Sequence, residues 1–171
     1  MEQTIVAKIQ IKVSTSDYVL LHDTMKSYSD ACNSVSEYVY TSHDLKRFHI
    51  NQMLYNDLRT NYGMRSQMAQ SVIITVIARY KTILTNQKEW IKPVFRKPQL
   101  DLVWNRDYSL NKTKDIFSVN TLNGRIKCGF FTNGFEQYFE NNCKFGTAKL
   151  TFKHGKFFLH IPVTYEINEL T

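Results

Sequence analysis

Residues 92–130 read KPVFRKPQLDLVWNRDYSLNKTKDIFSVNTLNGRIKCGF, a stretch that is basic, aromatic and punctuated by turn-forming residues. It holds eight Lys or Arg side chains against three Asp, with Phe, Trp and Tyr rings interleaved among them. Basic groups that follow a phosphate backbone gain binding energy from counterion release, and aromatic rings stack on unpaired bases. The pattern is therefore consistent with two interpretations, a nucleic-acid-binding surface or an ordinary sheet whose lysines face water, and by itself it favours neither.

Short strands are predicted inside this stretch. Residues 100–104 and 116–120 have the length and composition of strands, and a loop joins them. Asn123-Gly124 lies between two apolar segments, which is a signal for a hairpin with a type I′ turn.

Strands are also predicted on both sides of it. Residues 145–152 and 156–167 form a second expected hairpin around His154-Gly155. Residues 4–13, TIVAKIQIKV, alternate apolar and polar side chains as a half-buried strand does, and this strand needs partners from later in the chain. The strand count predicts a small antiparallel β-barrel of the oligonucleotide-binding type.

Three helices are predicted between the first strand and the rest of the barrel. Apolar residues recur at spacings of three and four from Tyr18 to Val39, which indicates a long amphipathic helix. A second helix is expected at 44–59 with Phe48, Leu54 and Leu58 facing inward, and a third at about 65–85. We therefore expect an α+β chain with two domains, a β-barrel formed by 1–14 and 88–171 and an inserted three-helix bundle formed by 15–87.

The positive charge is concentrated in the second half of the chain. The 171 residues carry a net charge of +7, and residues 81–160 hold fourteen basic and six acidic side chains. This distribution points to a polyanionic partner for that half. The three cysteines have no CxxC spacing, and neither a signal peptide nor a membrane-spanning run is recognisable, so we expect a soluble intracellular protein with reduced thiols.

No catalytic or metal-binding constellation stands out in the sequence. The five histidines are scattered, and no phosphate-binding glycine motif is present. Asp101, Asp107 and Asp115 are close in sequence, but their setting among lysines favours solvation or salt bridging over a metal site. We expect a binding module without a cofactor or metal, and not an enzyme.

The predicted third helix begins with several polar side chains. Gln67, Gln70 and Ser71 fall about one turn apart, and Arg65 precedes them. Amide side chains can contact adenine edges in a DNA groove, whereas a solvated polar helix face is the plainer alternative.

The order of strand, helical insert and basic β segment resembles one known family. The segments YKTILTNQKEWIKPVFRKPQLDLVWNRDYSL, FSVNTLNGRIKCGF and KLTFKHGKFFLHIPVTYEI resemble the N-terminal half of the TnpB (OrfB) family of transposon-encoded RNA-guided nucleases, and SQMAQSVI at 66–73 is similar to the start of its last recognition helix. The resemblance covers nearly the whole chain. It implies a wedge domain that is an oligonucleotide-binding-like barrel, interrupted after its first strand by a helical recognition domain.

The resemblance also implies roles for individual residues. Polar side chains of the recognition helices and of a wedge loop would read the short duplex motif that flanks the DNA target, and these positions are Ser66, Gln67, Gln70, Asn105, Arg106, Asn51 and Tyr55. The basic wedge surface would hold the scaffold of the guide RNA, which points to Lys92, Arg96, Lys97, Lys112, Lys114, Arg125 and Lys127.

The chain departs from the family pattern at its end. In the family a RuvC-like nuclease follows a segment like VTYEINELT, and here the sequence ends at Thr171. We expect a module that binds a guide RNA and a double-stranded DNA target in the prokaryotic cytoplasm, associated with the nucleoid. Cleavage would be absent or supplied by a RuvC-containing partner chain; the alternative is a nuclease-less regulatory or interaction protein derived from the same family.

Overall fold

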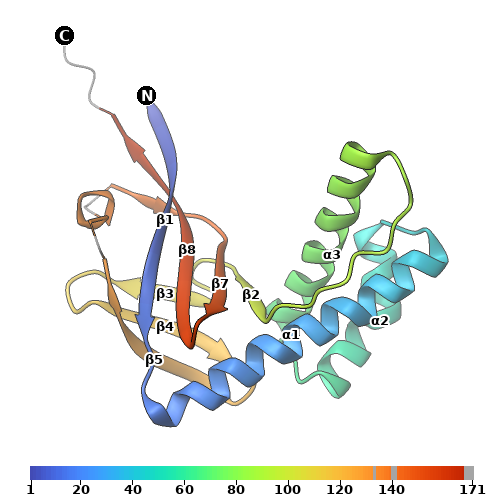
Figure 1. Ribbon diagram of the computed structural model, residues 1–171, viewed down its shortest axis with the longest axis horizontal. Coiled ribbons are helices and arrows are strands. Elements are labelled where there is room, and N and C mark those ends of the chain that lie inside the picture. The colour runs from blue at the N-terminus through green and yellow to red at the C-terminus, as the bar shows by residue number, and fades with distance from the viewer. Residues whose placement is uncertain (133, 140–141, 168–171) are drawn as a thin grey trace. The chain divides into compact units, whose positions relative to one another are not determined.

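The computed structural model describes residues 1–132, 134–139 and 142–167 (Figure 1). These residues form three α-helices and an eight-stranded antiparallel sheet that is nearly closed into a barrel. The predicted α+β class, a small antiparallel barrel with three helices inserted after its first strand, is thereby confirmed. Two compact units make up the chain, Met1–Leu21 together with Leu102–Thr171, and His22–Asp101.

The first strand occupies the middle of the β unit. It pairs with the last long strand on one side and with the fifth strand on the other, and the sheet order in this unit is β7-β8-β1-β5-β4-β3. The two-residue strand β6 pairs with β8. The strands are β1 (Glu2–Lys12), β2 (Gln99–Leu102), β3 (Tyr108–Asn111), β4 (Ile116–Thr121), β5 (Gly124–Phe131), β6 (Lys144–Phe145), β7 (Ala148–Lys153) and β8 (Lys156–Glu166), and a 3-10 helix spans Glu136–Phe139.

The alternation in β1 separates a core face from a solvent face. Ala7, Ile9 and Ile11 are buried, and Ile9 lies opposite Leu159 of β8. Because side chains point to opposite faces in turn, the polar residues between them must point away from the core. Aromatic and aliphatic side chains from β3, β4, β5, β7 and β8 complete the core, among them Tyr108, Phe117, Val119, Phe130, Leu150, Phe157 and Ile161.

One of the two hairpin turns differs from the sequence-based expectation. Thr121 pairs with Gly124, and only Gly124, at φ 88°, has a positive φ, so a type I′ turn at Asn123-Gly124 is wrong. This geometry is that of a type I turn followed by a glycine bulge. The type I′ geometry occurs instead at His154-Gly155, where both residues have positive φ, 52° and 76°.

The helical unit is built by α1 (Thr15–Ser42), α2 (Arg47–Asn61) and α3 (Ser66–Gln87), of which the first turns of α1 belong to the β unit. Most of the expected apolar stripe of α1 is buried. Phe48 was expected to face inward, but it is 69% exposed, and Ile50 and Leu58 are buried in its place. Phe48 lies two residues before Ile50, or about 200° around the helix, and therefore points away from the core.

An extended connector follows α3 and packs along α1. The Ser29 hydroxyl donates to the Lys97 carbonyl at 2.8 Å, and the Ser36 hydroxyl donates to the Pro93 carbonyl at 2.7 Å. The Asn33 amide donates to the carbonyl of Phe95 and accepts from its N–H, at 2.9 and 2.7 Å. Since this connector has no ladder of its own over most of its length, polar side chains of α1 satisfy its backbone, and the connector belongs to the helical unit.

Candidate nucleic-acid interface

Three basic side chains form a row across the outside of the sheet. His160 of β8 lies directly opposite Lys8 of β1 on one side and Lys149 of β7 on the other. The His160 ring hydrogen-bonds the Thr151 hydroxyl at 3.0 Å. Burial, and then the charges of Lys8 and Lys149, lower the pKa of His160 below its ordinary value of 6.5. The histidine is therefore neutral near pH 7, which limits the mutual repulsion of the row.

A second row, of aromatic rings, lies beside the first. Gln10 of β1 is opposite Phe158 of β8 and opposite Phe131 of β5. The Lys8 ammonium lies 4.7 Å from the centre of the Phe158 ring. The Lys12 ammonium lies 3.9 Å from the centre of the Phe131 ring, and Phe131 is 42% exposed. The two rings stand two strands apart, about 10 Å, so they present two separate stacking surfaces.

We call these two rows, with Lys12, the basic–aromatic face. Sequence analysis missed this face, because its members come from four segments of the chain that only the strand register brings together. The signal that could have pointed to it was the polar half of the alternation in residues 4–13. The members are Lys8, Gln10, Lys12, Phe131, Lys149, Phe158 and His160.

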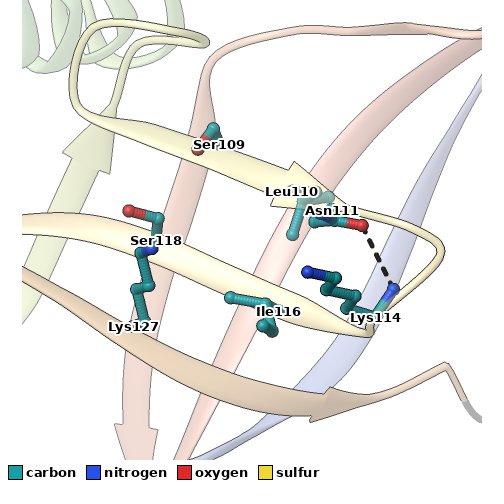
Figure 2. A pocket seen from close by; sticks show the side chains of 7 residues that line it. All are labelled: Ser109, Leu110, Asn111, Lys114, Ile116, Ser118 and Lys127. Atoms are coloured by element: carbon teal, nitrogen blue, oxygen red, sulfur yellow. Dashed lines mark hydrogen bonds between the residues drawn. The ribbon is translucent and has the colours of Figure 1, made fainter.

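A polar pocket lies on the outside of β3, β4 and β5, and two of the predicted RNA-binding residues line it (Figure 2). Lys114 and Lys127 line it, and its volume is about 260 Å³. Arg125 lies beside it: the Arg125 Nε donates to the Ser118 hydroxyl at 2.7 Å, and Nη2 donates to the Ser109 hydroxyl at 3.3 Å.

The remaining RNA-binding candidates lie apart from this pocket. The Lys112 ammonium lies 3.5 Å from the Cys143 sulfur and 5.8 Å from the centre of the Phe145 ring. In the helical unit, the Lys92 ammonium donates to Glu37 at 2.7 Å, and this hydrogen bond raises the pKa of Lys92. Arg96 and Lys97 lie on the connector of the same unit.

Four of the predicted DNA-contacting residues are joined by hydrogen bonds between α2 and α3. The Gln70 side-chain Nε2 donates to the Asn51 side-chain Oδ1 at 2.9 Å, and the Tyr55 hydroxyl donates to the Ser66 hydroxyl at 3.0 Å. Gln67 lies on the first turn of α3 beside Ser66.

Two arginines extend this network, and sequence analysis missed them. The Arg47 Nη2 donates to the Gln70 carbonyl oxygen at 3.2 Å, and the Arg59 Nη1 donates to the Tyr55 hydroxyl at 3.1 Å. The hydrogen bonds to Ser66 and Arg59 lower the pKa of Tyr55. Arg47, Asn51, Tyr55 and Arg59 are spaced by four residues, so helical periodicity could have placed both arginines on the same face.

The other two predicted DNA-contacting residues lie in a tight loop of the β unit. Asn105 has a φ of 65°, and its N–H donates to the Tyr108 carbonyl at 2.8 Å. The Arg106 carbonyl accepts from the Asn120 amide at 2.9 Å and from Arg125 Nη1 at 3.2 Å.

The same loop contains a buried carboxylate. One oxygen of Asp107 accepts from the Val103 N–H at 2.8 Å, whereas the other has no hydrogen-bond partner. Burial raises the pKa of Asp107 above 3.8, and the nearby charge of Arg125 offsets only part of that shift. Asp107 is thus a structural group whose ionised form is poorly solvated.

Among the residues that the structure describes, no three or more His, Cys, Asp or Glu side chains are grouped so that they could hold a metal ion. Burial raises the pKa of the Cys128 thiol to about 11, which keeps it protonated and unreactive. Within the described residues no helix has the length and apolar character needed to cross a membrane.

Comparison with known proteins assigns no family. No protein-family model matches the chain, and no curated protein matches it either.

Proposed function

We propose that this chain is the nucleic-acid-binding module of an RNA-guided DNA-binding system, with RNA held on the outside of the β unit. The observation that carries the proposal is the basic–aromatic face, in which the Phe158 and Phe131 rings flank Gln10 and a row of basic groups runs beside them. Rings that stack on bases next to cations that follow the phosphates are the two elements of single-strand binding.

The charge around this face supports the same proposal. The outward positions of β1 from residue 4 to 12, of β5 from 125 to 131 and of β8 from 158 to 164 include no acidic residue. A phosphate backbone laid across these three strands would therefore meet lysines without carboxylate repulsion. An ordinary solvated sheet face would more often mix both signs of charge.

The network on α2 and α3 supports a second, DNA-directed role. Asn51 and Gln70 are bonded to each other, and both are amides of the kind that pair with adenine edges. Arg47 holds the Gln70 carbonyl oxygen, so the amide orientation is set before a ligand arrives. We assign to this face the reading of a short duplex motif, and to a separate RuvC-containing chain any cleavage of the bound DNA.

The experiment is to purify the chain from its native host at moderate salt and to sequence the RNA that accompanies it. A discrete RNA that maps to a transposon end or to a repeat array is the expected result. A random mixture of RNAs, or protein free of RNA, would contradict the guide-RNA role. That result would favour the alternative of a nuclease-less regulatory or interaction protein.

A further inference from the structure

The pocket on β3, β4 and β5 presents hydrogen-bond donors without a carboxylate (Figure 2). Lys127 of β5 reaches up beside Ser118 of β4, and Lys114 runs back from the β3–β4 turn along the strands. Two ammonium groups thus border one small depression. Ammonium groups donate hydrogen bonds and never accept them, so an anion is their natural ligand.

The two hydroxyls of the pocket are oriented by a residue outside its lining. Arg125 donates to the Ser118 hydroxyl oxygen at 2.7 Å and to the Ser109 hydroxyl oxygen at 3.3 Å. A serine oxygen that accepts from a guanidinium still has its own O–H to donate. Arg125 therefore acts as a positioning residue that makes both hydroxyls available as donors, and Ser118, at 8% exposure, is held firmly.

The turn at the edge of the pocket adds a further donor. The side-chain Oδ1 of Asn111 accepts from the backbone N–H groups of Thr113 and Lys114, each at 3.1 Å. Because the acceptor end of this amide is used within the turn, its NH₂ end is the part available to a ligand.

We propose that this pocket binds one phosphate group. A tetrahedral phosphate has several acceptor oxygens and no need of an acceptor on the protein, which matches two ammonium groups, two hydroxyls and one amide. The volume of about 260 Å³ lies below the roughly 300–1,000 Å³ of pockets that enclose drug-sized ligands, so it suits one small anion and not a large cofactor. This site would be part of the RNA-binding surface, so the RNA experiment below rests on the proposed function. The bound phosphate belongs either to the terminus of an RNA strand or to its backbone.

The first experiment uses inorganic phosphate and does not depend on RNA. Amide chemical shifts of the full chain are followed by NMR during titration with phosphate, against chloride at matched ionic strength. Saturable shifts at residues 114–118 and 127 are expected, and they should disappear in Lys114→Gln/Lys127→Gln. They should persist in Lys153→Gln/Lys156→Gln, which removes two charges at the β7–β8 turn. Shifts that do not saturate, or that vanish equally in both variants, would overturn the site.

The second experiment measures the salt dependence of binding to single-stranded RNA with and without a 5′-phosphate. Each neutralised phosphate of a single strand contributes about 0.7 to the slope of log K against log salt. If both lysines hold one phosphate, either single variant leaves that phosphate paired with the remaining lysine and changes the slope little, whereas the double variant lowers the slope by about 0.7. A double variant that loses about 1.4 would contradict a shared phosphate, because the two lysines would then contact separate ones.

The two RNAs identify the source of the phosphate. A loss confined to the 5′-phosphorylated strand assigns the pocket to a terminal phosphate, and an equal loss for both strands assigns it to the backbone. An unchanged slope in the double variant, beside intact RNA binding, would overturn the pocket as part of the RNA site while leaving the proposed function in place. If the protein bound no RNA but still showed saturable phosphate shifts, the proposed function would be overturned and the phosphate pocket would stand.

Removing the hydroxyl from Ser109 tests the role of the oriented donors without changing charge. Ser109→Ala should weaken phosphate binding several-fold and leave the salt slope unaltered, because no counterion is released by a hydroxyl. Undiminished phosphate binding in Ser109→Ala would contradict the role proposed for Arg125, which is to orient the Ser109 hydroxyl as a donor to the phosphate.

Discussion

Truncation of Phe131 or Phe158, the two rings on the basic–aromatic face, should weaken RNA binding without changing its salt dependence. Stacking of a base on an aromatic side chain contributes about 1–3 kcal/mol by alanine substitution. In the free protein Lys8 and Lys12 lie over the rings of Phe158 and Phe131, and an exposed cation–π contact of this kind is worth about 0.5–1 kcal/mol. A base must displace the lysine, so the net loss for Phe131→Ala or Phe158→Ala should be about 1–2 kcal/mol, or about 5- to 30-fold in Kd.

Fluorescence anisotropy with a labelled single-stranded RNA, repeated over a range of salt, measures both quantities. The lines of log K against log salt for the two variants should lie parallel to that of the wild type and below it, because a stacked ring releases no counterions. Phe48→Ala is the matched control, since Phe48 is 69% exposed but lies on α2. Urea unfolding of each variant shows whether the fold is retained.

Two results would refute this reasoning. If Phe48→Ala weakened RNA binding as much as Phe131→Ala, the rings of the β unit would have no special role. If the ring variants changed the slope and not the intercept, their effect would come through displaced lysines and not through stacking.

Three other perturbations test separate parts of the structure. Burial raises the pKa of Asp107, so the folded state disfavours the ionised carboxylate. The free energy of unfolding should therefore fall as the pH rises from about 3.8 through the raised pKa. Asp107→Asn should remove this decline, which urea unfolding between about pH 3 and pH 7 measures. A bound polyanion should raise the lowered pKa of His160, because its negative charge offsets Lys8 and Lys149. The RNA affinity of the wild type should therefore rise as the pH falls from about 7 to about 5.5. A His160→Gln variant that kept this rise would contradict the placement of RNA beside His160. Gln70→Ala should relax the preference for a particular duplex sequence at about 1–3 kcal/mol per contacted base while RNA affinity stays constant, and an equal loss of RNA binding would argue against separate DNA and RNA faces.

Local periodicity predicted the elements of this fold well. The alternation of residues 4–13 predicted β1, and the three- and four-residue spacing after Tyr18 predicted α1. The short strand β3 was missed, because residues 108–111 resemble the loop on either side of them. Phe48 was misplaced, because it lies about 200° around α2 from Ile50, which is the residue that packs inward.

The candidate surfaces were harder to predict because they depend on contacts between distant segments. Lys8, Lys149 and His160 are separated by up to 152 positions, and only the register of β7, β8 and β1 makes them neighbours. The basic connector reads as part of the β segment, yet hydrogen bonds from Asn33 and other side chains of α1 hold it in the helical unit. In contrast, Asn51, Tyr55, Ser66 and Gln70 were named from the sequence and form two hydrogen-bonded pairs between α2 and α3.

The central claim, that RNA lies across the basic–aromatic face, is tested most directly by comparing two triple lysine variants. Lys8→Gln/Lys12→Gln/Lys149→Gln removes three charges from the basic–aromatic face, and Lys46→Gln/Lys81→Gln/Lys88→Gln removes three from the exposed surface of the helical unit. The first should lower the salt slope for single-stranded RNA by about 2, which is three phosphates at about 0.7 each, and the second should leave it unchanged. Equal slopes in the two variants would contradict the account, because the loss would then reflect net charge and not a binding face.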